Sequence, residues 1–169
     1  MTSPLNSDLL SNTELLTQNA CASVADFLLN NGLMLATAES CTGGMIAATC
    51  TDLAGSSAWF ERGFVTYSNA AKTDMLGVPA ALIDEHGAVS EPVARAMAIG
   101  ALKHSAAQVS LAVTGIAGPS GGSTDKPVGT VWFAWALAQG VRSEVRRFDG
   151  DRAAVRQATV LHALQGLIA

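Results

Sequence analysis

The chain has 169 residues, of which 49% are hydrophobic and 14% are charged, and its formal net charge is −4. This length fits one domain with a buried core, and the composition excludes a disordered chain. Every apolar stretch is interrupted before it reaches the ~20 residues that span a bilayer. No basic run provides the attraction that nucleic acids require. We therefore expect neither a membrane nor a nucleic acid as partner.

The two ends of the chain differ in character. Residues 1–10 have no charged n-region and no long apolar core, so we expect a flexible tail, no signal peptide and a cytoplasmic protein. Residues 11–169 are expected to form a single domain, and so apolar a chain makes a homo-oligomer plausible. Cys21, Cys41 and Cys50 lack CxxC spacing, which argues against a disulfide framework or a zinc site. We expect no metal and no cofactor.

The predicted elements alternate between helix and strand. A capping box of Ser11 and Glu14 begins an amphipathic helix that ends near Gly32. The next elements, in chain order, are a strand at 33–38, a helix at 45–51, a strand at 60–67, helices at 69–76 and 90–105, strands at 109–114, 130–137 and 141–148, and a helix at 151–167. Residues 115–129 are rich in glycine, proline and serine and predict a long loop.

This order predicts the fold class. Strands that alternate with helices are typical of a three-layer α/β/α sandwich with a mixed, mostly parallel sheet, here of about five strands. The last two strands are separated by a short turn and predict an antiparallel hairpin.

Polar segments follow three of the predicted strands. They are residues 39–44 (ESCTGG), 66–72 (TYSNAAK) and 114–119 (TGIAGP). Ligands of open α/β sheets bind at the carboxyl ends of strands, so we expect these segments to meet at one site.

The first segment indicates a serine nucleophile. Ser40 lies on a sharp turn, and Gly43 and Gly44 allow close approach of backbone amides that can hold an oxyanion or a phosphate. Two alternatives stay open on the residues alone. Ser40 or Thr42 could merely cap the next helix, and Cys41 could be the nucleophile, because a helix N-terminus lowers the pKa of a thiol.

A serine nucleophile needs a base, and Lys72 is the candidate. His86, in a loop before Gly87, stays open as an alternative base, although none of the three histidines, His86, His104 and His162, forms a convincing triad pattern. Lys72 lies one helical turn beyond a strand end, five residues after Tyr67, which could orient it or relay a proton. A lysine acts as base when its pKa falls from about 10.4 to about 7–8. Most lysines are exposed, so a solvated Lys72 is the alternative.

The remaining candidates are ligand-binding groups. Thr114 and Gly115 offer a hydroxyl and backbone donors, although the loop that follows could be a structural Ω-loop. Arg152 and Arg156 are four residues apart at the start of the last helix, so they could face one way and hold a phosphate. Two solvated arginines are the alternative.

The same segments resemble the CinA C-terminal domain family. The resemblance extends over roughly residues 13 to 165, and several separate motifs occur in the family's order. The matching segments are 38–44 (AESCTGG), 54–63 (AGSSAWFERG), 66–69 (TYSN) with Lys72, 87–91 (GAVSE), 115–119 (GIAGP) and 126–131 (KPVGTV).

This resemblance implies an amidohydrolase of pyridine nucleotide recycling. The implied reaction is hydrolysis of the carboxamide of nicotinamide mononucleotide to nicotinic acid mononucleotide and ammonia, with Ser40 as nucleophile, Lys72 as base and Tyr67 as its partner. Residues expected against the substrate are Thr42, Gly43, Gly44, Thr114, Gly115, Arg152 and Arg156. A nucleotide-binding module without hydrolysis, or an amidase for another small amide, remains an alternative.

Overall fold

The structure is a computed structural model that describes residues 11–169; the expected tail at residues 1–10 lies outside the described residues. The strands are β1 (Leu35–Glu39), β2 (Phe60–Val65), β3 (Val109–Gly115), β4 (Thr130–Leu137) and β5 (Gly140–Arg147). The helices are α1 (Asn12–Asn31), α2 (Met45–Asp52), α3 (Asn69–Leu76), α4 (Ala80–His86), α5 (Glu91–Lys103) and α6 (Arg152–Leu167), with a short 3-10 helix η1 at Ser56–Ala58.

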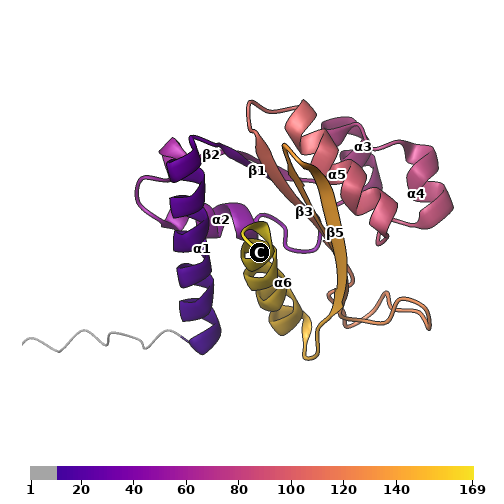
Figure 1. The fold of residues 1–169 in the computed structure, drawn as a ribbon. Coiled ribbons are helices and arrows are strands. Elements are labelled where there is room, and N and C mark those ends of the chain that lie inside the picture. The colour runs from indigo at the N-terminus through magenta and orange to yellow at the C-terminus, as the bar shows by residue number, and fades with distance from the viewer. Residues whose placement is uncertain (1–10) are drawn as a thin grey trace, which may run out of the picture.

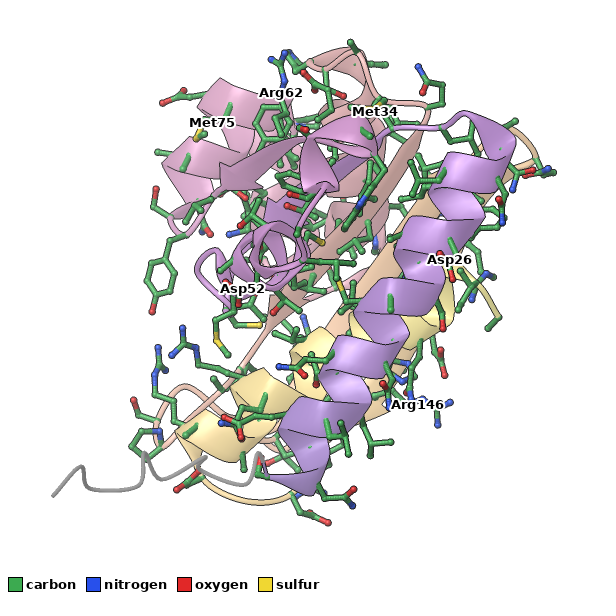
Figure 2. The ribbon with its side chains drawn as sticks, turned by 90° about the vertical axis from the view of Figure 1, so that its left-hand side faces the viewer. Asp26, Met34, Asp52, Arg62, Met75 and Arg146 are labelled. Atoms are coloured by element: carbon green, nitrogen blue, oxygen red, sulfur yellow. The ribbon has the colours of Figure 1, made fainter. Side chains whose placement is uncertain are left out.

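Helices cover both faces of one five-stranded sheet (Figure 1). One face is covered by α1, α2 and α6, and the other by α3, α4 and α5. Figure 2 shows α1 running alongside α6, with Asp26 on α1 and Asp52 at the end of α2. The predicted three-layer α/β/α sandwich is therefore confirmed. No helix among residues 11–169 is long and apolar enough to cross a bilayer.

The sheet has the order β2-β1-β3-β4-β5 and is mixed, as predicted. β1 pairs in parallel with β2 and β3, whereas β4 pairs antiparallel with β3 and β5. Only β4 runs against the other strands, yet two of the four pairings are antiparallel, so "mostly parallel" holds for strand direction and not for pairing. The physical reason is the connection between β3 and β4, which contains no crossover helix that would return the chain for parallel pairing.

Large and small side chains alternate along β3 and β4. Leu111, Phe133 and Trp135 pack on the face covered by α1, α2 and α6, whereas Ala112 and Ala134 face α5. Successive residues of a strand point to opposite faces, so this alternation creates one bulky and one shallow layer. In the shallow layer, α5 lies so close to the sheet that Ser110 donates a hydrogen bond to the carbonyl of Ala98 at 2.7 Å.

Two short elements, α4 and η1, have no counterpart in the predicted order. Helix α4 buries only Ile83, so the apolar periodicity that indicates a helix is nearly absent there. Gly77 ends α3 as expected, because its left-handed φ of 67° closes that helix. Strand β1 begins at Leu35, two residues later than predicted. The backbone of Leu33 still bonds to the end of α1.

The connections around β1 create the place for a site. After β1 the chain passes through α2 on one face of the sheet to reach β2. It then passes through α3, α4 and α5 on the other face to reach β3. Such a reversal opens a crevice at the carboxyl ends of the two strands.

Candidate active site

A cavity of about 250 Å³ lies at the carboxyl ends of β1, β2 and β3. All three predicted polar segments contribute to its walls. The lining residues are Ser40, Cys41, Tyr67, Asn69, Lys72, Ala88, Val89, Thr114, Gly115, Ala117 and Arg152.

The turn after β1 brings Ser40 to this cavity. The Ser40 amide donates to the carbonyl of Val113 at 3.1 Å, which extends the pairing of β1 with β3 by one residue. The chain then turns sharply, and the Gly43 amide donates back to the Ser40 carbonyl at 3.1 Å. Gly43 and Gly44 have φ of 58° and 100°, a left-handed conformation that glycine adopts without strain. The turn leaves Ser40 only 8% exposed at the edge of the sheet.

Helix α3 brings Lys72 to the same place. Ser68 caps this helix by accepting a hydrogen bond from the Ala71 amide at 3.0 Å. One turn later, Lys72 is 1% exposed and its Nζ donates to Ser40 Oγ at 3.0 Å. The same nitrogen donates to the carbonyls of Thr66 at 2.9 Å and Tyr67 at 3.3 Å. The alternative of a solvated lysine is excluded by this burial.

Lys72 is buried without a countercharge. Among residues 11–169, no carboxylate forms an ion pair with it. Removal from water disfavours the charged amine, and burial lowers the pKa of Lys72 from 10.5 to about 8, while Cys41 has a smaller opposite effect. A substantial fraction of the amine is therefore neutral near pH 7–8.

The three partners of Nζ fit an ammonium, which donates to all three, and they also fit a neutral amine. A neutral amine has two N–H donors and one lone pair, and a carbonyl oxygen only accepts hydrogen bonds. Thr66 and Tyr67 can thus take both N–H groups, which leaves the lone pair facing the hydroxyl of Ser40, a group that both donates and accepts. The geometry allows Ser40 to donate its proton to Lys72.

The neighbouring thiol of Cys41 is in a different state. The pKa of the Cys41 thiol is raised to about 11, mainly by burial; the backbone hydrogen bond lowers it in part, Glu39 raises it, and Arg156 and Lys72 lower it. The thiol is protonated at neutral pH, and only a thiolate is a strong nucleophile. Lys72 Nζ bonds to the oxygen of Ser40, which favours Ser40 over Cys41.

Tyr67 and Arg152 lie at the open side of the cavity. Tyr67 is 63% exposed, and its phenol oxygen accepts a long hydrogen bond from Arg152 Nη2 at 3.5 Å. Its contact with Lys72 is made by the backbone carbonyl and not by the phenol. Arg152 also donates from Nη1 to the carbonyl of Gly118 at 2.9 Å, which fixes the direction of the guanidinium.

Four of the expected substrate-binding residues do not line this cavity: Thr42, Gly43, Gly44 and Arg156. Thr42 is buried and donates its hydroxyl to Glu39. The expected anion site at the start of α2 is also occupied, because the Glu39 carboxylate accepts the amides of Ile46 at 2.8 Å and Ala47 at 2.9 Å.

Arg156 lies beside a second cavity, of about 480 Å³. This cavity shares Ala117 and Arg152 with the first, so the two adjoin at Arg152. The two arginines therefore do face one common space, as their spacing indicated. Arg156 uses Nε and Nη2 to donate to the carbonyls of Cys41 and Thr42, each at 3.1 Å.

Two side-chain hydrogen bonds hold the segment around Ala88 and Val89, which lines the first cavity. Thr114 donates its hydroxyl to the carbonyl of Ala88 at 2.9 Å, and Lys126 donates to the carbonyl of His86 at 2.9 Å. Among the described residues, no histidine lines the cavity, and no group of three His, Cys, Asp or Glu side chains is placed to share a metal ion.

Four further residues line the cavity although the sequence predicted no individual role for them: Asn69, Ala88, Val89 and Ala117. Asn69 could have been found, because it lies one helical turn before Lys72 and so shares its side of α3. Ala88, Val89 and Ala117 carry no chemical signature and enter the cavity only through the path of the chain.

Comparison with known proteins identifies the family. Residues 17–169 match the CinA C-terminal domain family. An Escherichia coli (strain K12) protein named nicotinamide-nucleotide amidohydrolase PncC is 57% identical over 145 residues, which cover 85% of this chain and 88% of that protein. A Pseudomonas putida protein of the same name is 60% identical over 132 residues, covering 78% and 82% respectively.

A crystal structure agrees with these matches. The competence-damaged protein (CinA) superfamily protein from Escherichia coli has a TM-score of 0.88 with 38% identity, covering 95% of this chain and 92% of that one. The family match, the two relatives and the shared fold together show that the chain belongs to the CinA C-terminal domain family.

Proposed function

We propose that this chain is a serine amidohydrolase that converts nicotinamide mononucleotide and water into nicotinic acid mononucleotide and ammonia. The observation that carries the proposal is the 3.0 Å contact between Lys72 Nζ and Ser40 Oγ, with Lys72 buried and its pKa lowered to about 8. The substrate class is supported by the two bacterial relatives, both named nicotinamide-nucleotide amidohydrolase.

In the first step, neutral Lys72 removes the proton of the Ser40 hydroxyl. The oxygen attacks the carboxamide carbon, and the electron pair of the C=O bond moves onto the carbonyl oxygen. The base is already in contact with the hydroxyl, so this step requires no large movement of either side chain.

The oxyanion needs a hydrogen-bond donor, and the Cys41 amide is the best placed. The Gly43 amide donates to the Ser40 carbonyl, the Met45 amide donates to the Thr42 carbonyl, and the amides of Ile46 and Ala47 donate to Glu39. In a trans peptide the N–H points opposite to the C=O, so the Ser40 carbonyl that faces Gly43 turns the Cys41 N–H to the outside of the turn. Cys41 lines the cavity, and we assign its amide as the donor to the oxyanion.

In the second step, protonated Lys72 gives its proton to the carboxamide nitrogen, and ammonia leaves as the C–N bond breaks. An ester between Ser40 and the nicotinoyl group remains. Water attacks this ester and transfers a proton to Lys72, which returns it to the Ser40 oxygen. The enzyme is then regenerated with a carboxylate product.

The substrate would extend from Ser40 toward Arg152. The exposed ring of Tyr67 offers a face for the pyridine, and the side chain of Asn69 carries both a donor and an acceptor for the carboxamide. Arg152 lies where the two cavities adjoin and is the group that meets the phosphate.

The test is ammonia release by the purified wild-type chain and by the Ser40→Ala variant. We expect release from nicotinamide mononucleotide by the wild type alone, and slower release from nicotinamide riboside and from nicotinamide, which lack the phosphate. Tight binding of the mononucleotide without ammonia release would instead identify a nucleotide-binding module. Equal rates on all three amides would identify an amidase that does not recognise a nucleotide.

A further inference from the structure

We infer that Glu39 and Arg156 are positioning residues that hold the turn at residues 40–44, here called the Ser40 turn, from two sides. Glu39 accepts hydrogen bonds from O–H and N–H groups of the turn and of the start of α2, and Arg156 donates to two carbonyls of the turn. The inference rests on the proposed function only in taking Ser40 as the nucleophile. It gives Arg156 a role other than the phosphate contact that its helix position indicates.

Glu39 forms the inner half of this clamp. It is the last residue of β1 and is fully buried. Its Oε1 accepts from Thr42 Oγ1 at 2.7 Å and from the Ile46 amide at 2.8 Å, and its Oε2 accepts from the Ala47 amide at 2.9 Å. These bonds tie the residue before Ser40 to the middle of the turn and to the first turn of α2.

Arg156 forms the outer half. It comes from α6, more than a hundred residues later, and is half-buried. Its Nε and Nη2 reach two consecutive carbonyls, those of Cys41 and Thr42, at 3.1 Å each. The planar guanidinium offers this pair of parallel donors, which the single ammonium of a lysine does not. The Cys41–Thr42 and Thr42–Gly43 peptide planes are therefore held in one orientation, directly after the peptide that carries the Cys41 N–H.

The clamp fixes the reacting groups and not the substrate. Neither Glu39 nor Arg156 lines the cavity that contains Ser40; Arg156 lines the adjoining cavity, but its Nε and Nη2 are bonded to the turn. The turn they hold carries the Ser40 hydroxyl and the Cys41 amide, the nucleophile and the proposed oxyanion donor. A shift of about 1 Å in such groups can slow a reaction roughly 100-fold.

The variants for the test are Glu39→Gln and Arg156→Lys. Glutamine keeps the shape but turns one acceptor into an N–H donor that faces other donors, and lysine keeps the charge but loses the paired bonds. Matched controls elsewhere are Glu144→Gln and Arg95→Lys; Glu144 pairs with Arg146 on β5, and Arg95 on α5 donates to Ser143.

The main readout is the rate at which phenylmethylsulfonyl fluoride labels Ser40, followed by intact mass with Ser40→Ala as the blank. This probe is uncharged and carries no phosphate. We expect both clamp variants to slow labelling roughly 10- to 100-fold and to lower kcat by a similar factor. The KM for nicotinamide mononucleotide and the pH midpoint of kcat/KM should stay unchanged, and the controls should label at the wild-type rate.

The contrary result is an Arg156→Lys variant that labels at the wild-type rate, shows a raised KM for nicotinamide mononucleotide and has normal kinetics on the riboside. That result would overturn the inference and identify Arg156 as a phosphate contact. Normal labelling by both variants would overturn it outright. If Glu39→Gln does not fold, Arg156→Lys decides the question. Amide hydrogen exchange of the peptide over residues 40–48 provides a second measurement, and it should become faster in Arg156→Lys.

The proposed function and this inference fail separately. A wild-type chain that releases no ammonia from nicotinamide mononucleotide would reject the proposed function, whereas the labelling rates would still show whether the clamp sets the reactivity of Ser40.

Discussion

The chain places a buried acid at the end of β1 and a buried base beyond the end of β2, and it surrounds the two side chains differently. Glu39, at the end of β1, has hydrogen-bond donors on both carboxylate oxygens. Lys72, beyond the end of β2, meets two carbonyls and one hydroxyl and has no anionic partner within residues 11–169.

This difference indicates that Glu39 stabilises the backbone of its turn, whereas Lys72 is the reactive group. A buried carboxylate whose two oxygens both accept hydrogen bonds from the surrounding chain holds that chain in place. A buried amine without a countercharge is easily deprotonated, and the lowered pKa of Lys72 reflects that. The four predictions below test whether the two turns divide the work in this way.

The largest effect is expected from Lys72→Met, which keeps the volume of the side chain and removes the amine. Without a base, the Ser40 hydroxyl is a weak nucleophile, and we expect kcat for ammonia release to fall roughly 1,000-fold or more. Circular dichroism should show an unchanged fold. Turnover within tenfold of the wild type would mean that the amine of Lys72 is not the base.

The pH dependence of the wild type should report the same amine. Below its pKa of about 8, Lys72 carries a proton and cannot accept another, so kcat/KM should rise about tenfold per pH unit up to about pH 8 and then level off. Initial rates between pH 5.5 and 9.5 provide the measurement. A rate that is flat or falls between pH 6 and 8 would contradict a neutral-amine mechanism.

The two buried groups should affect stability with opposite signs. At pH 7, Lys72→Met should raise the free energy of unfolding by up to about 3 kcal/mol, because the fall in pKa from 10.5 to about 8 costs about 1.36 kcal/mol per unit. This gain should shrink between pH 8 and 10.5, because folded-state Lys72 is neutral there while the unfolded lysine still carries its proton, so wild-type stability rises with pH.

Glu39→Gln should lower the free energy of unfolding by roughly 1–3 kcal/mol, because it leaves a buried N–H donor without an acceptor. Urea denaturation of both variants at several pH values tests the pair. Stabilisation by both substitutions would mean that Glu39 does not support its turn.

The smallest effect is expected from Cys41→Ala. With a thiol pKa near 11, Cys41 carries no negative charge at neutral pH and takes no part as a nucleophile. We expect kcat/KM to stay within about threefold of the wild type, since the Cys41 backbone amide is retained. Complete loss of ammonia release in this variant, with the fold intact, would return the nucleophile to the thiol.

The sequence predicted the layers, the chain order of the main elements and the segments that meet at the site. It did so because hydrophobic periodicity, capping residues and glycines act within a few residues of one another. Helix α4 was not predicted, because Ile83 is its single buried residue and one buried residue shows no hydrophobic periodicity. The parallel fraction of the sheet was overstated because pairing direction depends on how a connection crosses the sheet.

The sequence by itself determined the candidate groups of the site, through the local pattern at residues 39–44 and the spacing of Tyr67 and Lys72. Only the tertiary structure decided that Lys72 is buried with no carboxylate beside it, and that Arg156 reaches a turn 115 residues earlier in the chain. A pKa and a hydrogen bond both depend on which groups surround an atom in space. At this site those groups come from the turns after β1 and β2, from the end of β3 and from helices α3 and α6, which are distant in sequence.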